Sequence, residues 1–178
     1  MPRLFTGLEI PPHVSAALSA LRGGLAGARW VDPENYHITL RFIGDIDDAT
    51  AREIAAGLGQ VKRPPFTLTL EGLAAFGGRK PRAVVASVPP APPLMELQAE
   101  HERIMQRLGL EAEGRRYTPH VTLARMRDVS SRAVADYLAQ HGLFRTSAFE
   151  VGRFVLFSAR ASTGGGPYLA EAAFPLAT

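Results

Sequence analysis

The chain has 178 residues, of which 46% are apolar and 21% charged, and its formal net charge is +3 at pH 7. This length fits one compact domain or two small lobes that share a core, and the composition excludes a disordered chain. The chain contains no cysteine, which excludes disulfides and thiolate metal sites, and it has no apolar run long enough to span a membrane. The N-terminal residues show no signal-peptide pattern, so we expect a cytoplasmic protein without membrane contact.

Strands and helices are mixed along the first half of the chain. Alternating apolar residues bounded by proline or glycine predict strands, and apolar residues three or four apart predict helices. The predicted order is strand Arg3–Ile10, helix His13–Leu25, strand Tyr36–Ile43, a helix from Asp47 or Asp48 to Gln60, and strands Phe66–Leu73 and Ala83–Val88. The loop Gly77–Pro81 joins the last two strands.

The second half continues in the same way. After the proline-rich stop Pro89–Pro93, the predicted order is a helix ending at Leu108, strand His120–Met126, helix Ser130–Gln140, and strands Phe149–Phe157 and Tyr168–Phe174. The triple glycine Gly164–Gly166 connects the last two strands. No helix follows it, which disfavours a phosphate-binding loop and favours a hairpin loop. Strand pairs with short connections predict an α+β fold.

One tetrapeptide organises the whole sequence. His37-Ile38-Thr39-Leu40 returns in the second half as His120-Val121-Thr122-Leu123, and each copy begins a predicted strand that is followed by a helix. This repeat predicts two pseudo-symmetric lobes, each an antiparallel-rich sheet with helices on its outer face, around a central cleft. The chain is then a single domain, residues 1–178, with motifs at 37–40 and 120–123.

The paired motif suits phosphoryl chemistry without a metal. Residues two apart in a strand share a face, so each histidine points the same way as its threonine, and the aliphatic residues point into the lobe. One neutral imidazole can take a proton from water while a protonated one donates to the leaving oxygen. The threonine hydroxyls can hydrogen-bond the phosphoryl oxygens.

Two other interpretations of the motif must be weighed. A single His-x-Thr sequence in a strand is common and is usually structural. A metal site would need ligands that this spacing does not provide, because no second histidine and no cysteine lies nearby. The recurrence of the whole tetrapeptide in matching strands favours the catalytic interpretation over both.

The motifs and their flanks carry a resemblance to a known family. With Arg29–Tyr36 before the first copy and Tyr117-Thr118-Pro119 before the second, the chain resembles the 2H phosphoesterase superfamily. Within it the chain is similar to the bacterial and archaeal RNA 2′,3′-cyclic phosphodiesterases, also called 2′-5′ RNA ligases. The resemblance implies two lobes related by a pseudo-twofold axis, no cofactor and no metal. It also implies that His37 is the proton donor and His120 the proton acceptor, a division of roles that the sequence alone does not fix.

Two arginines are candidate phosphate-binding residues, together with Thr39 and Thr122. Arg41 lies two residues beyond Thr39, so strand parity points it into the cleft. Arg125 has the wrong parity in a regular strand, but the resemblance implies a substrate-binding arginine there. We therefore expect the second motif strand to end or bulge near Ala124. Each arginine could instead be a solvated charge at a strand end.

We expect hydrolysis of RNA 2′,3′-cyclic phosphate ends to 2′-phosphates, by a monomer that binds RNA or a related cyclic nucleotide. One alternative is a ligase that joins 2′-5′ RNA ends, which is the reverse chemistry. Others are a phosphodiesterase for small cyclic nucleotides and an RNA-binding module without catalysis. Binding alone needs no imidazole pair, which disfavours the last alternative.

Overall fold

The structure is a computed structural model, and it describes residues 3–159 and 167–177. The elements follow in the order β1 (Arg3–Glu9), α1 (Pro12–Ser19), β2 (Arg29–Trp30), the 3-10 helix η1 (Pro33–Asn35), β3 (His37–Asp45), α2 (Asp48–Leu58), β4 (Phe66–Leu68), β5 (Leu73–Phe76), β6 (Ala83–Ser87), α3 (Pro92–Arg107), β7 (His120–Arg125), α4 (Ser131–Gln140), β8 (Phe149–Val151), β9 (Arg153–Ala159) and β10 (Tyr168–Pro175).

One antiparallel sheet runs through the molecule, with strand order β10-β9-β1-β3-β7-β6-β5 and β2 paired to β7. The two motif strands, β3 and β7, are neighbours at its centre. They pair antiparallel at Ile38 and Val121, the second residues of the two tetrapeptides. The repeated motifs therefore meet at corresponding positions.

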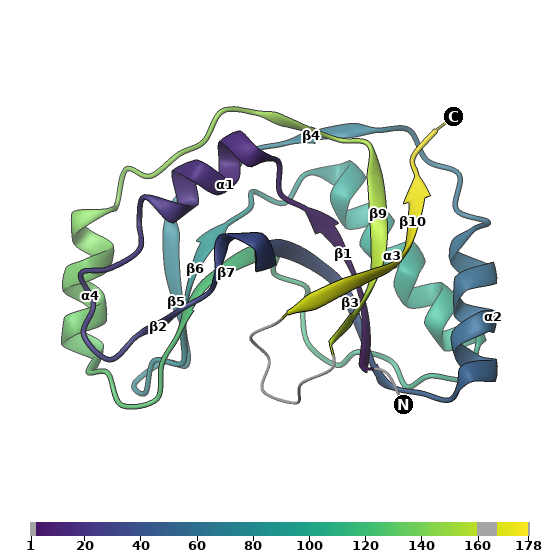
Figure 1. The fold of residues 1–178 in the computed structure, drawn as a ribbon, viewed down its shortest axis with the longest axis horizontal. Coiled ribbons are helices and arrows are strands. Elements are labelled where there is room, and N and C mark those ends of the chain that lie inside the picture. The colour runs from purple at the N-terminus through teal and green to yellow at the C-terminus, as the bar shows by residue number, and fades with distance from the viewer. Residues whose placement is uncertain (1–2, 160–166, 178) are drawn as a thin grey trace.

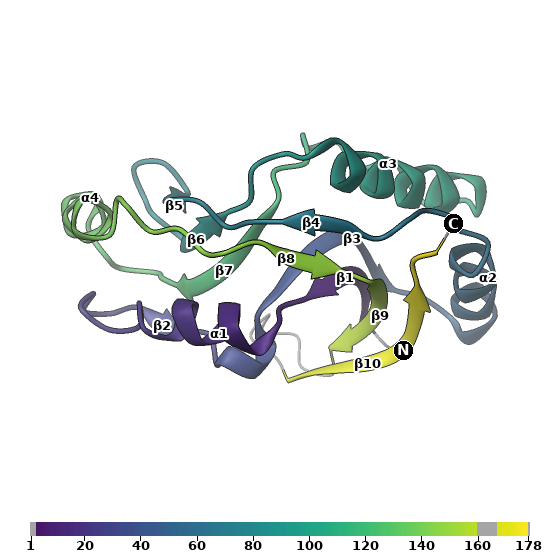
Figure 2. The ribbon, with the colours of Figure 1, turned by 90° about the horizontal axis from the view of Figure 1, so that it is seen from above.

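The two halves of the chain are built alike. On one side of the centre the order is β3, β1, β9, and on the other it is β7, β6, β5. A second sheet pairs β4 with β8, one strand from each half. Figure 1 places α2 and α3 at the end of the molecule with β9 and β10, and α4 at the opposite end near β5. Figure 2 shows β4 and β8 running side by side between these ends. The expected α+β class with two pseudo-symmetric halves is confirmed.

Helices α2 and α4 begin at side-chain caps, whereas α1 and α3 begin at prolines without one. The Asp47 carboxylate accepts a hydrogen bond from the Thr50 backbone N–H at the start of α2, and the Ser130 hydroxyl accepts one from Ala133 at the start of α4. The core includes the aliphatic residues of both motifs, each at most 2% exposed: Ile38, Leu40, Val121 and Leu123. Burial of these four residues leaves the histidines and threonines to face the cleft.

The structure differs from the predicted elements at four places. The two strands expected at Phe66–Leu73 and Phe149–Phe157 are each divided, and their first parts form the β4–β8 sheet. The first helix ends at Ser19 because Gly23 and Gly24 have positive φ angles, which a right-handed helix cannot contain. The short strand β2 was not predicted.

The loop expected at Gly164–Gly166 lies outside the described residues. No helix within residues 3–159 and 167–177 has both the length and the apolar character needed to cross a membrane.

Candidate active site

A β-bulge follows the threonine in each motif strand. In β3, Thr39 pairs with Gly7 and Arg41 with Thr6, so Leu40 has no partner in β1. In β7, Thr122 pairs with Val85 and Ala124 with Val84, so Leu123 has none in β6. An extra residue in one strand reverses the alternation of side chains beyond it. The two bulges occupy equivalent positions of the repeat.

The bulge in β7 brings Arg125 to the face that carries His120 and Thr122. All three side chains line the same cleft. The irregularity that the sequence analysis expects near Ala124 is therefore present. The Arg125 Nε atom is buried and has no hydrogen-bond partner among the described residues, while the side chain lines the cleft.

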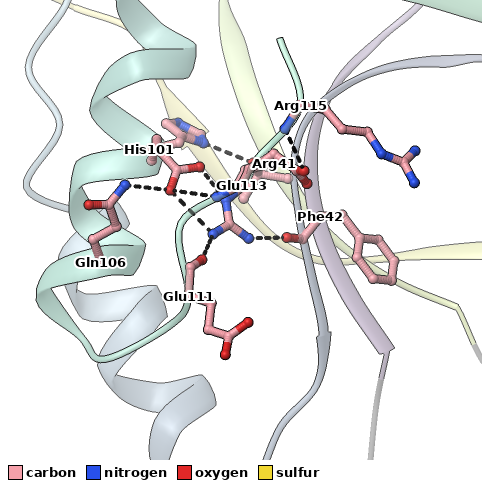
Figure 3. Close-up of polar contacts among 9 residues, drawn as sticks. Arg41, Phe42, His101, Gln106, Glu111, Glu113 and Arg115 are labelled. Carbon is pink, nitrogen blue, oxygen red and sulfur yellow. Dashed lines mark hydrogen bonds and ion pairs between the residues drawn. The ribbon is translucent and has the colours of Figure 1, made fainter. Parts of the chain in front are cut away.

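In β3, Arg41 lies just beyond the bulge. Its side chain is only 7% exposed, and its Nε donates to the Glu102 carboxylate at 2.7 Å (Figure 3). Phe42 takes the position equivalent to Arg125 and lines the cleft with 48% of its surface exposed. Arg41 lines the cleft, as its position two residues beyond Thr39 predicts, but the sequence did not show that its charge is paired with Glu102. Arg41 remains at the edge of the cleft, with its charge paired.

His37 is held by hydrogen bonds at both ring nitrogens. Its Nδ1–H donates to the Asn35 carbonyl at 2.9 Å, which leaves Nε2 as the acceptor in the neutral ring, 3.0 Å from Thr39 Oγ1. The ring also contacts Phe5 and Tyr168 at centroid distances of 4.9 Å. Burial lowers the pKa of His37 to about 4; the hydrogen bond to Asn35 opposes this effect, and the charges of His120 and Arg125 reinforce it.

His120 repeats this arrangement in the other half. Its Nδ1–H donates to the Thr118 carbonyl at 2.7 Å, again two residues earlier in the chain. Phe76 packs edge-on against the ring at 4.8 Å. Burial lowers the pKa of His120, the bond to Thr118 opposes the shift, and Arg125 adds to it. Because a carbonyl can only accept, both histidines are fixed in the tautomer that presents Nε2 for chemistry.

Both motifs open onto one cleft of about 970 Å³. Its lining includes every candidate site residue that the sequence analysis names: His37, Thr39, Arg41, His120, Thr122 and Arg125. Three further arginines also line it, Arg82, Arg115 and Arg116, against two carboxylates, Glu102 and Glu113. The excess of arginine over glutamate makes the cleft suited to an anion.

Sequence reasoning missed the structural role of Tyr117. Its hydroxyl donates to the backbone carbonyl of Thr39 at 2.7 Å. This bond links the segment just before the second motif to the first motif strand. Burial raises the pKa of Tyr117, which keeps the hydroxyl protonated as a donor. The only sequence signal was its position three residues before His120, and nothing there indicates the distant partner.

The donor set of the cleft is made of imidazoles, hydroxyls and guanidinium groups. In the part of the chain that the structure describes, no three or more His, Asp or Glu side chains are grouped to hold a metal ion. Two imidazoles that line one arginine-rich cleft can take a proton from water and donate one to the leaving oxygen of a phosphodiester.

Comparisons with known proteins agree with this geometry. The profile of the LigT-like phosphoesterases matches twice, at residues 8–86 and 85–168, and each match contains one motif. The chain belongs to the LigT-like phosphoesterase family. Its duplicated match also supports the internal repeat.

Two curated relatives share the same description. The RNA 2′,3′-cyclic phosphodiesterase of Aeropyrum pernix is 35% identical over 141 residues, which cover 75% of this chain and 80% of that protein. The protein of the same name from Aquifex aeolicus is 29% identical over 145 residues, covering 79% and 77% of the two chains. A crystal structure of E. coli LigT complexed with 3′-AMP superposes with a TM-score of 0.81 over the whole of both chains at 22% identity, and it confirms the fold.

Proposed function

We propose that this family member is an RNA 2′,3′-cyclic phosphodiesterase that hydrolyses cyclic phosphate ends to 2′-phosphates. The observation that carries the proposal is the matched pair of histidines, each with Nδ1–H bonded to a carbonyl two residues earlier and both lining one cleft. The names of the curated relatives support the substrate class.

The proposed reaction is a single in-line displacement at phosphorus. His120 Nε2 takes a proton from water as the water oxygen bonds to phosphorus. The bond from phosphorus to the 3′ oxygen breaks, and protonated His37 donates from Nε2 to that oxygen. The phosphate stays on the 2′ oxygen. One proton has left water for His120 and one has passed from His37 to the 3′ oxygen, so exchange with solvent then returns both imidazoles to their starting states. The assignment of donor and acceptor follows the family resemblance.

In this proposal the bound phosphate makes one of the two histidines a proton donor. In the empty cleft, burial lowers the pKa of both histidines below 6.5, so both are neutral near pH 7. An anionic phosphodiester between them favours the protonated form of one imidazole and thus raises its pKa. Substrate binding therefore creates the proton donor.

The remaining cleft groups fit the substrate in this proposal. Thr39 and Thr122 donate hydrogen bonds to the phosphoryl oxygens, and Arg125 gathers the negative charge that develops in the transition state. All of these groups come from one chain, so a monomer would suffice.

Product identification is the most direct test of the proposal. Purified protein is given a short RNA with a 2′,3′-cyclic phosphate end, with and without EDTA, and the phosphomonoester is identified by mass spectrometry and by its resistance to 3′-specific phosphatase. We expect a 2′-phosphate at the same rate in both samples. A 3′-phosphate, or activity lost in EDTA and restored by zinc or manganese, would contradict the proposal.

Two variants serve as controls for contaminating nuclease. His37→Ala and His120→Ala should each lower the rate by on the order of 10²–10⁴-fold, because each removes one proton-transfer group. If joined 2′-5′ products accumulate in place of the 2′-phosphate, the chain is instead a ligase under those conditions.

A further inference from the structure

One wall of the cleft has no regular secondary structure. Residues 111–117, which we call the 111–117 wall, lie between α3 and the second motif and include six consecutive exposed residues at 111–116. Arg115, Arg116 and Tyr117 of this wall line the cleft. Neither Arg115 nor Arg116 forms a side-chain ion pair among the described residues, so both can meet a substrate.

The Arg41 guanidinium fastens this wall to the first motif strand. Its Nη2 donates to the Glu111 backbone carbonyl at 2.6 Å, and its Nη1 donates to the Phe42 carbonyl. Its Nε and Nη2 face the two Glu102 carboxylate oxygens at 2.7 and 3.4 Å. Figure 3 shows the guanidinium enclosed by these acceptors. With its donors engaged in this way, Arg41 is poorly placed to bind phosphate.

Glu102 holds the same wall at a second point. Its Oε2 accepts from the Glu113 backbone N–H at 3.3 Å and from Gln106 Nε2 at 2.8 Å (Figure 3). Burial would raise the pKa of Glu102, but the hydrogen bonds from Arg41, Gln106 and Glu113 outweigh it and lower the pKa. The carboxylate is therefore charged at neutral pH, as its pairing with Arg41 requires.

The base of this network is fixed to the sheet. His101, the neighbour of Glu102 on α3, is fully buried, and its Nδ1 lies 2.8 Å from the Thr6 hydroxyl on β1. Thr6 pairs with Arg41 in the sheet register. Glu102 thus lies on helix α3 and Arg41 on strand β3, whereas the 111–117 wall that they hold has no regular secondary structure.

We propose that Arg41 and Glu102 are a positioning pair that holds the 111–117 wall in place, so that Arg115 and Arg116 bind the phosphates preceding the reacting end of an RNA chain. This inference rests on the proposed function. A mononucleotide has no preceding phosphates, so the pair affects its turnover little. The positioning pair therefore sets a preference for oligonucleotides over free cyclic nucleotides.

Glu102→Ala separates this role from direct phosphate binding by Arg41. If Arg41 bound phosphate, removal of its carboxylate partner would free the guanidinium and lower KM. If the pair positions the wall, the same change releases Glu113 and loosens Arg41, and KM for an oligonucleotide rises. The two mechanisms predict opposite signs.

The kinetic test compares wild type, Glu102→Ala and Glu100→Ala on two substrates, a pentanucleotide with a 2′,3′-cyclic phosphate end and cytidine 2′,3′-cyclic phosphate. Glu100 is the matched control, because it lies on the same helix and pairs with Arg63 away from the cleft. We expect Glu102→Ala to raise KM for the pentanucleotide about tenfold, with kcat and the cytidine substrate changed less than about twofold. Equal losses on both substrates, or a lower KM, would overturn the inference.

Limited trypsin digestion tests the wall without reference to activity. Trypsin cuts after Arg115 and Arg116, and it needs local opening of the segment to do so. At a temperature well below the melting transition of each protein, we expect Glu102→Ala to be cut there about ten times faster than wild type, with Glu100→Ala unchanged. Unchanged cutting would overturn the positioning role. If wild type turns over neither substrate, the proposed function fails, and digestion still decides whether the pair holds the wall.

Discussion

Three histidines are fixed by a hydrogen bond at Nδ1, and the position of the other nitrogen separates their roles. In His37 and His120 the partner is a backbone carbonyl and both residues line the cleft, where His37 Nε2 lies 3.0 Å from Thr39 Oγ1. In His101 the partner is Thr6, and Nε2 is buried without a partner among the described residues. Burial lowers the pKa of all three rings, so a place in the cleft lining, and not the pKa alone, distinguishes the proposed catalytic pair from His101.

The pH profiles should differ between the free enzyme and its complex. The profile of kcat/KM reports the free enzyme, in which burial lowers the pKa of His37 to about 4 and also lowers that of His120. The profile of kcat reports the complex, in which the phosphate anion raises the pKa of one imidazole. We therefore expect the limbs of the kcat profile to lie at higher pH than those of kcat/KM. Steady-state rates at constant ionic strength measure both profiles. Coincident profiles would contradict the proposal that the bound phosphate raises the pKa of one imidazole.

Arg125→Ala should chiefly lower kcat. The side chain lines the cleft, and a positive charge that meets the developing negative charge acts more strongly in the transition state than in the ground state. We expect a loss of ~10–10³-fold in kcat with a smaller change in KM. Arg127→Ala is the control, since Arg127 is exposed two residues further along and does not line the cleft. A silent Arg125 variant would remove it from the proposed mechanism.

At the scale of the strand, each motif carries an arginine just beyond a bulge. Both arginines line the cleft, but among the described residues only Arg41 is paired there with a carboxylate. The sequence predicted the faces of His37 and Thr39 correctly, because period-two alternation holds up to the threonine. It did not predict the bulge beyond Thr39 or the ion pair of Arg41 with Glu102, because both depend on long-range pairing that leaves no local signal. The same limit explains the two divided strands, since only long-range pairing shows that β4 and β8 form a separate sheet.

Gly7→Ala should disturb the bulge in β3. Gly7 is buried opposite Thr39, and a Cβ there would lie 2.8 Å from the Ile38 carbonyl oxygen, so the backbone of the motif must move. We expect a loss of about 1–3 kcal/mol in the free energy of unfolding, measured in urea, together with a lower kcat. Gly152→Ala is the matched control, because its Cβ would enter open space. Equal stability of the two variants would show that the sheet absorbs the extra methyl group without strain.

For the whole molecule, duplication explains why so much could be predicted. The repeated tetrapeptide predicted two similar halves and the α+β class, and the doubled family match agrees with it. The sequence did not show that both halves share one sheet, because contact between Ile38 and Val121 joins residues far apart in the chain. It also gave no sign of the network from Arg41 through Glu102 to residues 111–117, whose partners come from three separate segments.

Acid stability is a property of the whole fold, and His101 should contribute strongly to it. The ring is fully buried between α3, β1 and the Phe154 side chain, and burial, with a smaller effect of the Arg63 charge, lowers its pKa to about 3. An unfolded histidine has a pKa near 6.5, so between about pH 6.5 and 3 the unfolded chain binds the extra proton. The free energy of unfolding therefore falls as the pH falls through this window, by on the order of 3 kcal/mol at pH 4 from this residue.

His101→Gln removes the titration and keeps a side chain that can bond to Thr6. We expect this variant to be less stable than wild type at pH 7, because the packing against Phe154 changes, but to lose less stability between pH 7 and pH 4. His37 acts in the same direction in both proteins, so its effect cancels in the comparison. Urea unfolding at several pH values measures the two slopes, with His13→Gln as the control at an exposed position. Parallel slopes for wild type and His101→Gln would mean that His101 takes up its proton in the folded state as readily as in the unfolded one, through an opening of α3 from the sheet.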